Sequence, residues 1–395
     1  MTGVVNAELL DRVRERLAAQ PGEHDPARLA SAIRAEAGRM LGDTDLLRAL
    51  RVLQTEMTGA GALEPLLHDA RVSDVLVTAP DAVWVDRGNG PERTSVRFPD
   101  EAAVRRLAQR LALAAGRRLD DAQPWVDGRL PEYEQASGES VGVRLHAVLA
   151  PIAQGGTCIS LRVLRPVGHD LRALRARGTL SAESEQLLHR IIRARLAFLV
   201  VGGTGAGKTT LLSALLAQVD PSERIICVED AAELAPPHPH IVRLVARTTN
   251  VEGAGAVTVR DLVRQSLRMR PDRIVIGEVR GGEVVDLLTA LNTGHDGGAG
   301  TVHANSPREV PARLEALAAL GGMSRAGLHS QLAAAVQVVL AVRRRADGVR
   351  VLQEIGLVTR DLEAGVRIET AWSAESGPAP ASSALRRLLD ERLRR

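Results

Sequence analysis

The sequence contains little cysteine and few aromatic residues, and both scarcities exclude a class of protein. Its two cysteines, Cys158 and Cys227, belong to no CxxC or other ligand-spaced cluster, so we expect two reduced core residues and neither a zinc centre nor a disulfide framework. Three Trp, one Tyr and two Phe among 395 residues are too few and too scattered to form the stacking platforms of single-strand binders. The sequence therefore predicts no direct contact with nucleic acid.

The chain also lacks the features of a membrane-spanning or exported protein. The longest apolar run, 332–342, is interrupted by Gln337 and is shorter than a transmembrane helix. The first residues, MTGVVNAELLDRVRER, include acids and lack the basic and apolar segments of a secretory signal. With 45% hydrophobic and 25% charged residues, the composition is that of a globular protein, and 395 residues correspond to two or three domains. We expect a cytoplasmic protein.

Lysine is the scarcest basic residue. Lys and Arg together number 51, and Lys208 is the only lysine, which leaves 50 arginines. A general replacement of lysine by arginine explains the excess, but it does not explain why one lysine is kept. The net charge is only +3, so the balance of charge indicates no particular partner.

The single lysine stands in a phosphate-binding motif. GGTGAGKT at 202–209 matches GxxxxGK[ST], with the strand-like AFLVV before it and the amphipathic LLSALLAQV after it. Backbone N–H groups of such a loop surround a β-phosphate, the lysine reaches the β- and γ-phosphates, and the hydroxyl of Thr209 coordinates Mg²⁺. A guanine-reading N-K-x-D motif is impossible without a second lysine, so we predict ATP with Mg²⁺. The predicted nucleotide-binding residues are Gly202, Gly203, Thr204, Gly205, Ala206, Gly207, Lys208, Thr209 and Thr210.

Two apolar runs after this loop end in acidic residues. RIICVEDAAEL places Glu229 and Asp230 at the end of a predicted strand, and RIVIGEVRGGE does the same for Glu278. Ligands of open α/β sheets lie at the carboxyl ends of the strands, so these acids are expected on the side of Lys208. We predict Glu278 as the catalytic acid and Glu229 as a second ligand of magnesium or water. An exposed strand-end carboxylate without function remains the alternative for each.

Two histidines follow in GHDGGAGTVHAN. His295 lies in a glycine-rich loop and His303 at a predicted strand end, and their spacing is not that of a zinc site. A histidine beside the γ-phosphate can sense its presence through a hydrogen bond. The alternative is a structural histidine, and the sequence leaves both possibilities open.

The hydrophobic pattern divides the chain into four parts. Residues 1–57 have helical spacing and predict a helical extension; 58–165 combine short strand-like runs (DVLV, AVWVD, TSVRF) with a helix near 100–115 and predict an α+β domain. In 166–345 apolar strands alternate with helices, which predicts an α/β domain with a mostly parallel sheet. The remaining 346–395 contain two predicted strands and a basic helix. The fold class is therefore α/β with a smaller α+β domain before it.

The motifs together resemble a known family. GGTGAGKTTLL, RIICVEDAAEL, LRMRPDRIVIGEVRGGE and TGHDGGAGTVHANSPREVPARLE, spread over 59–342, resemble the type II/IV secretion ATPase superfamily, and most closely its CpaF/Tad (tight adherence) pilus-assembly branch, with its conjugal-transfer-associated ATPases. The resemblance implies a RecA-like ATPase core, a hexamer, and a motor docked on a platform protein at the cytoplasmic face of the inner membrane. It makes Glu278 the Walker B glutamate, the Glu229 region the Asp box, and His295 with His303 the His box.

The same resemblance implies that arginines of the N-terminal domain reach the nucleotide. GVRLHAVLAP and ISLRVL suggest Arg144 and Arg162 for this role. The segment before Arg144, DGRLPEYEQASGESVGVR, is longer and more acidic than is usual in the branch, so Arg129 remains an alternative to Arg144.

Two other functions remain open at this point. One is a DNA-translocating RecA-like ATPase, which the scarcity of aromatic residues disfavours; the other is a nucleotide-gated scaffold without catalysis. The basic segments 171–177 and 386–395 could contact anionic lipid, although such runs are more often solvated helix faces.

Overall fold

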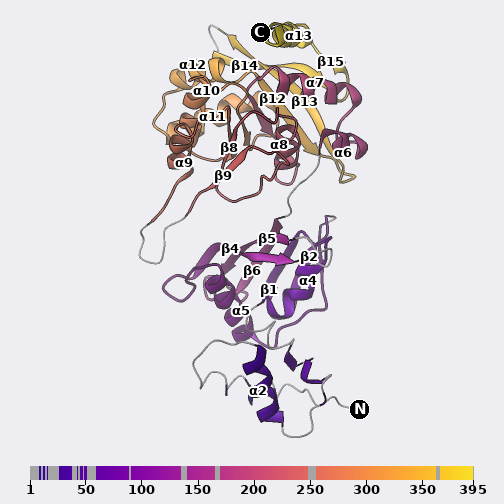
Figure 1. The fold of residues 1–395 in the computed structure, drawn as a ribbon, viewed down its shortest axis with the longest axis vertical. Helices are drawn as coiled ribbons and strands as arrows, with labels where there is room; N and C mark the ends of the chain where they lie inside the picture. The colour runs from indigo at the N-terminus through magenta and orange to yellow at the C-terminus, as the bar shows by residue number, and fades with distance from the viewer. Residues whose placement is uncertain are drawn as a thin grey trace. The chain divides into compact units, whose positions relative to one another are not determined.

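The computed structural model describes most of the chain, and the chain divides into two compact units. The described residues are 9, 12–13, 16, 26–37, 42, 45–47, 49–50, 59–88, 90–134, 140–164, 170–247, 255–361 and 365–394. One unit comprises Met1–Arg165 and the other Pro166–Arg395; Figure 1 labels the elements of both. Within the described residues, no helix combines the length and the apolar character needed to cross a membrane.

The predicted helical extension lies largely outside the described residues. Its described part contains helix α2, Pro26–Ala37, which buries Leu29 and Ile33. These side chains form a small cluster with Leu9, Val13, Ala32, Leu46 and Ala49.

The first unit is built on an antiparallel sheet of six strands in the order β3-β2-β1-β6-β5-β4. The strands are β1 (Asp74–Ala79), β2 (Ala82–Asp86), β3 (Pro91–Arg93), β4 (Trp125–Glu134), β5 (Ser140–Val148) and β6 (Cys158–Leu164). Alternate residues such as Val143, Leu145 and Ala147 are buried against helix α5 (Glu101–Ala114) and the short α4 (Glu64–His68). The opposite face carries charged side chains such as Arg144 and Arg162 together with apolar ones such as Leu76 and the exposed Trp125.

Two sequence predictions for this unit need correction. TSVRF at 94–98 is not a strand, because the pairing with β2 ends at Arg93. Strand β4 was not predicted, because Gly128, Pro131 and acidic residues interrupt its alternation of apolar and polar residues. The helix predicted near 100–115 is confirmed: α5 begins after Asp100, whose carboxylate accepts a hydrogen bond from the backbone N–H of Ala103 at 2.7 Å.

The second unit contains a sheet of nine strands in the order β15-β14-β13-β12-β7-β11-β10-β8-β9. Six strands are parallel: β7 (Phe198–Val201), β8 (Ile225–Glu229), β9 (Ile241–Val245), β10 (Arg273–Val279), β11 (Ala299–Val302) and β12 (Val338–Arg344). Cys227 is a free cysteine in the middle of β8, and burial raises the pKa of its thiol, which makes it an unreactive core residue.

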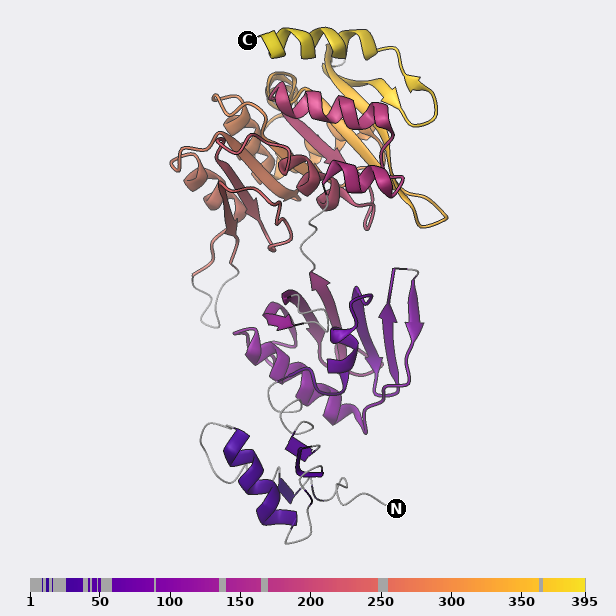
Figure 2. The ribbon, with the colours of Figure 1, turned by 45° about the vertical axis from the view of Figure 1, so that its right-hand side comes forward.

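Helices cover both faces of this sheet. Phe198 and Val200 of β7 point to one face, which packs against α6 (Leu171–Ala176), α7 (Ala182–Arg193), α8 (Lys208–Leu216) and α13 (Ser382–Arg394). Leu199 and Val201 point to the other, which packs against α9 (Val259–Ser266), α10 (Glu283–Leu291), α11 (Val310–Leu320) and α12 (Arg325–Ala335). Figure 2 shows α6 and α7 in magenta, with α13 in yellow beside α7. The predicted α/β sheet with helices on two faces is confirmed.

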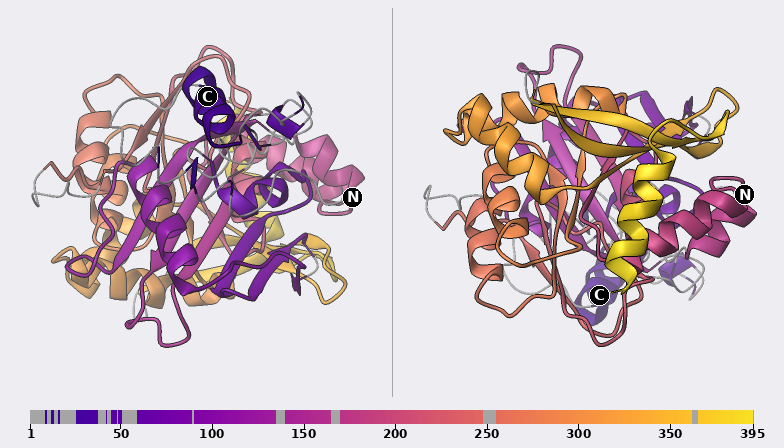
Figure 3. Two further views of the ribbon diagram at one scale, coloured as in Figure 1. Left: turned by 90° about the horizontal axis from the view of Figure 1, so that it is seen from below. Right: turned by 90° about the horizontal axis from the view of Figure 1, so that it is seen from above.

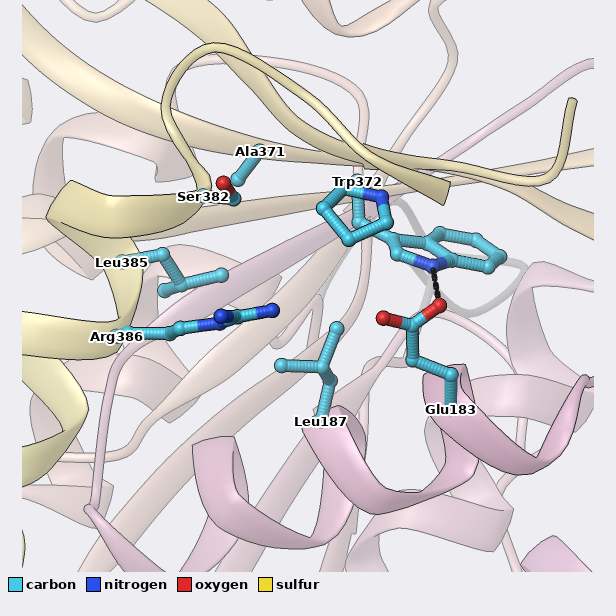
Figure 4. Close-up of a pocket in the computed structure, with 8 residues that line it drawn as sticks. Glu183, Leu187, Ala371, Trp372, Ser382, Leu385 and Arg386 are labelled. Atoms are coloured by element: carbon cyan, nitrogen blue, oxygen red, sulfur yellow. Dashed lines mark hydrogen bonds between the residues drawn. The ribbon is translucent and has the colours of Figure 1, made fainter. Parts of the chain in front are cut away.

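The last part of the chain extends the same sheet. It forms three strands: β13 (Arg350–Asp361), β14 (Gly365–Ser373) and β15 (Gly377–Pro378). Each is antiparallel to the next, and β13 pairs antiparallel with β12 along the whole of β12. In the right panel of Figure 3, α13 crosses beside β14 and α7. The indole N–H of Trp372 donates to Glu183 of α7 at 3.0 Å, and Leu385 of α13 is buried next to this pair (Figure 4). Residues 346–395 therefore belong to the second unit.

A buried arginine fixes the end of β10 that lies away from Glu278. Arg273 is 1% exposed and makes two hydrogen bonds to Glu223, at 2.9 and 3.0 Å. It also donates to the carbonyl oxygens of Ile192 and Gly297. These bonds satisfy the guanidinium and hold α7, β10 and the loop before β11 together.

Candidate functional site

The glycine-rich loop connects β7 to α8, as the motif requires. Gly205 and Gly207 have φ of +72° and +99°, a region that residues with a side chain rarely adopt. A Cβ at Gly202 would lie 2.4 Å from the carbonyl oxygen of Val342, so only glycine fits there. The sequence folds in this way because three of its glycines meet backbone requirements that other residues would not meet.

Lys208 lies inside this loop. It is 8% exposed, and its Nζ donates to the carbonyl oxygens of Gly202 at 3.0 Å and Gly203 at 3.2 Å. Burial lowers the pKa of its ammonium group, and the carboxylate of Glu278 acts against this shift. The loop therefore holds a partly desolvated cation beside backbone N–H groups at a helix N-terminus, which is an arrangement suited to phosphate.

The ends of β10 and β11 bring two predicted residues to Lys208. His303, just after β11, has its Nε2 3.5 Å from Nζ of Lys208 and in close contact with the carboxylate of Glu278. Burial and the charge of Lys208 lower the pKa of His303, so its imidazole is neutral at pH 7. Lys208, His303 and Glu278 thus form a continuous chain of polar contacts.

Arg280 completes this chain and was not predicted. Its guanidinium contacts Glu278 and also bonds Asp230, at the end of β8, at 2.6 Å. It therefore joins the carboxyl ends of β8 and β10. Among 50 arginines, nothing in the sequence distinguishes this one except its position two residues after Glu278.

Glu229 has a different environment from Glu278. Its Oε1 accepts hydrogen bonds from the backbone N–H groups of Glu233 at 3.0 Å and Leu234 at 2.9 Å, while its buried Oε2 has no hydrogen-bond partner among the residues that the structure describes. Burial raises the pKa of this carboxyl to about 7. The strand beside it makes room, since a Cβ at Gly277 would lie 2.8 Å from Cγ of Glu229. Glu229 therefore holds the loop that follows β8, and Glu233 of that loop is close enough to raise the pKa of Lys208.

The structure does not bring His295 to the loop of Lys208. His295 precedes β11, whereas His303 follows it, so the two histidines lie at opposite ends of one strand. The Nδ1 atom of His295 lies 2.9 Å from the carbonyl oxygen of Ala290, at the end of α10. Its neighbour Asp296 forms an ion pair with Arg392 of α13 at 2.9 Å.

Arg144 and Arg162 lie on the face of the first unit's sheet that points away from α5. The register of β4, β5 and β6 places Arg129 opposite Arg144 and Arg144 opposite Arg162, so three arginines form a row across neighbouring strands. Arg144 pairs with Asp127 at 2.7 Å, and Arg162 with Asp74 at 2.8 Å. Like charges directly opposite one another destabilise a sheet. The row is therefore a candidate anion-binding surface of this unit.

The residues near the loop suit magnesium bound together with a nucleotide. Thr209 is the second residue of α8, and its hydroxyl has no hydrogen-bond partner within the described residues. Glu229 offers one oxygen without a partner among the described residues, but β11 and β10 lie between its strand, β8, and β7 in the sheet. Across the described ranges no group of three or more His, Cys, Asp or Glu could hold a metal by itself. Hydroxyl and carboxylate oxygens are ligands that Mg²⁺ accepts when phosphates and water supply the others.

Comparison with known proteins finds a matching family profile and several similar sequences. A family profile described as type II/IV secretion system protein matches residues 56–353. A protein of Mycobacterium tuberculosis named as a conjugal transfer protein is 67% identical over 356 residues, which cover 89% of this chain and 99% of that one. VirB11 of Agrobacterium fabrum is 30% identical over 342 residues, covering 78% of this chain and 95% of its own.

A solved structure shares the fold. The pilus retraction motor PilT with bound ADP has a TM-score of 0.52 at 19% identity, over 84% of this chain and 87% of that chain. This likeness confirms the RecA-like α/β fold expected from the sequence. Together with the matches of sequence, it leads to one conclusion: the chain belongs to the type II/IV secretion system protein family.

Proposed function

We propose that the protein is an ATPase that drives secretion, conjugal transfer or pilus assembly. One observation carries the proposal: the contact of Lys208, His303 and Glu278 at the end of a phosphate-binding loop. A loop that only linked a strand to a helix would not require a buried lysine and a carboxylate from a different strand. The relatives named above add a secretion or transfer context.

In this proposal the loop 202–207 and the first turn of α8 bind the phosphates of ATP. The backbone N–H groups of the loop surround the β-phosphate, and Lys208 exchanges its bonds to Gly202 and Gly203 for phosphate oxygens. Thr209 and Thr210 follow at the start of the helix, where the dipole favours negative charge. Bound Mg²⁺, held by Thr209 and by Oε2 of Glu229, would neutralise charge that develops on the phosphates.

Glu278 is the residue proposed to orient the attacking water. Its carboxylate lies at the end of β10 in contact with His303 and Arg280, both of which can hold it in one position. The neutral imidazole of His303 lies between Glu278 and Lys208, so it is suited to sense the γ-phosphate by a hydrogen bond. His295 has no proposed part in this chemistry because it lies at the other end of β11.

Arg144 and Arg162 are proposed to contact the nucleotide from the first unit. Arg144 forms an ion pair with Asp127 and Arg162 forms one with Asp74, and such ion pairs at a surface are weak enough to exchange for phosphate. Arg129 stands in the same row and remains an alternative to Arg144.

The finer parts of the proposal concern assembly and place in the cell. We propose a hexamer that docks on an inner-membrane platform protein at the cytoplasmic face, in the CpaF/Tad branch of the family. The resemblance of the motif set at 202–305 to this branch supports the proposal. Exposed arginines on α6 and α13 offer a surface for peripheral contact with a membrane.

The single lysine allows a sharp test. An amine-reactive acylating reagent, followed by peptide mapping, should modify Lys208 in the free protein, and saturating ATP with Mg²⁺ should protect it. Wild type should hydrolyse ATP and Lys208→Ala should not. Hydrolysis at the wild-type rate by Lys208→Ala would overturn the proposal.

A second candidate function is DNA translocation in conjugal transfer. The name of the M. tuberculosis relative favours it, whereas the scarcity of aromatic residues does not. Stimulation of the ATPase by DNA, and not by lipid vesicles, would favour this candidate. Full function of Glu278→Gln in cells would instead support a scaffold without catalysis.

A further inference from the structure

The hairpin formed by β12 and β13 places an arginine on the phosphate-binding loop. Nε of Arg350, the first residue of β13, donates to the carbonyl oxygen of Gly205 at 3.1 Å. A Cβ at Gly207 would lie 2.9 Å from Cδ of Arg350. Gly207 therefore leaves room for this side chain in addition to adopting its positive φ. Arg350 is 145 residues away in sequence from Gly205, so the motif alone gave no indication of it.

Positive charge is concentrated around Arg350. The register of the hairpin sets Arg344 directly opposite Arg350, and a backbone bond from Leu352 to Thr179 at 2.9 Å holds β13 beside the turn that follows α6. Burial, and then the charges of Arg344 and of Arg177 at the end of α6, lower the pKa of Arg350. Facing arginines on adjacent strands repel one another and reduce the stability of the hairpin unless an anion lies between them.

No carboxylate in the described part of the chain is paired with Arg350. Its one hydrogen bond to the described residues uses Nε, which leaves the two terminal nitrogens of the guanidinium available. A guanidinium has its donors in a planar fork that matches the oxygens of a phosphate. This arginine is therefore fixed at one nitrogen and able to bind an anion with the others.

We propose that Arg350 binds a phosphate group of the nucleotide held in the loop, and that Arg344 and Arg177 strengthen the positive field on that side. The inference rests on the proposed function, because it assumes that the loop binds a nucleotide. Phosphate is the favoured anion because the bond to Gly205 holds the guanidinium against the loop whose N–H groups form the phosphate site. An acidic side chain of another protein copy would have no reason to require that bond.

The test measures binding of ADP and of a non-hydrolysable ATP analogue by calorimetry, with the full chain. The variants are Arg350→Gln and Arg350→Lys, and the matched control is Arg345→Gln, which removes an exposed arginine of the same hairpin that pairs with Asp347. We expect Kd to rise about tenfold in Arg350→Gln. Arg350→Lys should recover part of this loss, and the difference between the variants should shrink in high salt. Arg345→Gln should bind as wild type does.

Several results would overturn this inference. An unchanged Kd in Arg350→Gln would do so, even if the assembly became smaller, which would point to contact with another protein copy. Equal loss in Arg350→Lys and Arg350→Gln would show that the residue only shapes the loop. Failure of the proposed function is distinguishable, because then wild type itself would not bind the nucleotides, or Lys208→Ala would bind them equally well.

Discussion

Strands β8 and β10 are parallel neighbours in one sheet and both carry a glutamate after an apolar run, yet the two carboxyl groups lie in different environments. The side chain of Glu278 is 16% exposed and contacts His303 and Arg280. Glu229 is 2% exposed, and its only hydrogen bonds come from backbone N–H groups. The same local pattern therefore places one carboxyl group in contact with Arg280 and His303, and the other among backbone N–H groups where burial raises its pKa.

The largest expected effect comes from neutralising the carboxylate of β10. Glu278→Gln keeps the shape of the side chain but removes the charge that is proposed to orient water, so kcat for ATP should fall by about 100-fold or more, with ATP affinity within a few-fold of wild type. Steady-state hydrolysis and equilibrium binding measure the two quantities. Glu375→Gln, an exposed glutamate remote from the loop in sequence, is the control. A kcat within twofold of wild type for Glu278→Gln would show that Glu278 is not a catalytic residue.

The carboxyl of β8 should instead act on stability. The pKa of Glu229 is about 7 in the folded protein against an ordinary 4.5, so the folded state binds its proton more tightly than the unfolded state. Its contribution is complete below about pH 4.5 and is lost as pH rises through 7, a change of about 3 kcal/mol. The free energy of unfolding, measured with denaturant from pH 5 to pH 8, should therefore fall more steeply in wild type than in Glu229→Gln.

The control for this prediction is again Glu375→Gln, whose free energy of unfolding should depend on pH as that of wild type does. If Glu229→Gln lowers the free energy of unfolding by the same amount at pH 5 and at pH 8, the carboxyl of Glu229 is ionised in the folded state. The proposed difference in environment between Glu229 and Glu278 is then wrong. Activity gives a second reading. A Glu229→Gln protein that folds but no longer responds to Mg²⁺ would show that its Oε2 binds the metal.

An effect of intermediate size is expected for one of the two histidines that flank β11, His303, and not for the other, His295. His303→Gln removes the group between Lys208 and Glu278, and kcat should fall roughly tenfold, which corresponds to about 1.4 kcal/mol. His295→Gln changes a side chain that contacts only the end of α10 among the bonds described, so kcat should stay within twofold. Hydrolysis assays on both variants, with melting temperatures to show that both are folded, test this. An equal loss in both would mean that His295 reaches the nucleotide in a conformation different from this one.

The sequence predicted the part of this site that depends on residue type alone. Glycines at 202, 205 and 207 and the single lysine at 208 are required by backbone geometry and by phosphate chemistry, so they are visible without coordinates. The acids at strand ends were also predictable, because an apolar run followed by a carboxylate marks the end of a buried strand. Their different environments were not, since these depend on which backbone N–H groups and cations the fold brings near.

Arginines were the least predictable component. When nearly every basic residue is Arg, the residue type carries no information, and only contacts separate Arg280 and Arg350 from the rest. The same limit applied to the fold where Gly and Pro interrupt β4, which hid a strand that pairs with β5. Long-range pairing supplied what local pattern could not.

The smallest expected effect concerns the arginine that joins the two strand ends. Arg280 is 52% exposed and bridges Glu278 and Asp230, and exposed ion pairs contribute at most about 1 kcal/mol. Arg280→Gln should therefore lower kcat by only about threefold, while Arg268→Gln, an arginine bonded to a carbonyl oxygen of its own segment, should have no effect. A loss as large as that of Glu278→Gln would mean that Arg280 touches the reacting phosphate itself. In that case the position of the Glu278 carboxylate would depend on the bound nucleotide more than on Arg280. The contrast between the ends of β8 and β10 would then arise only when ATP is bound.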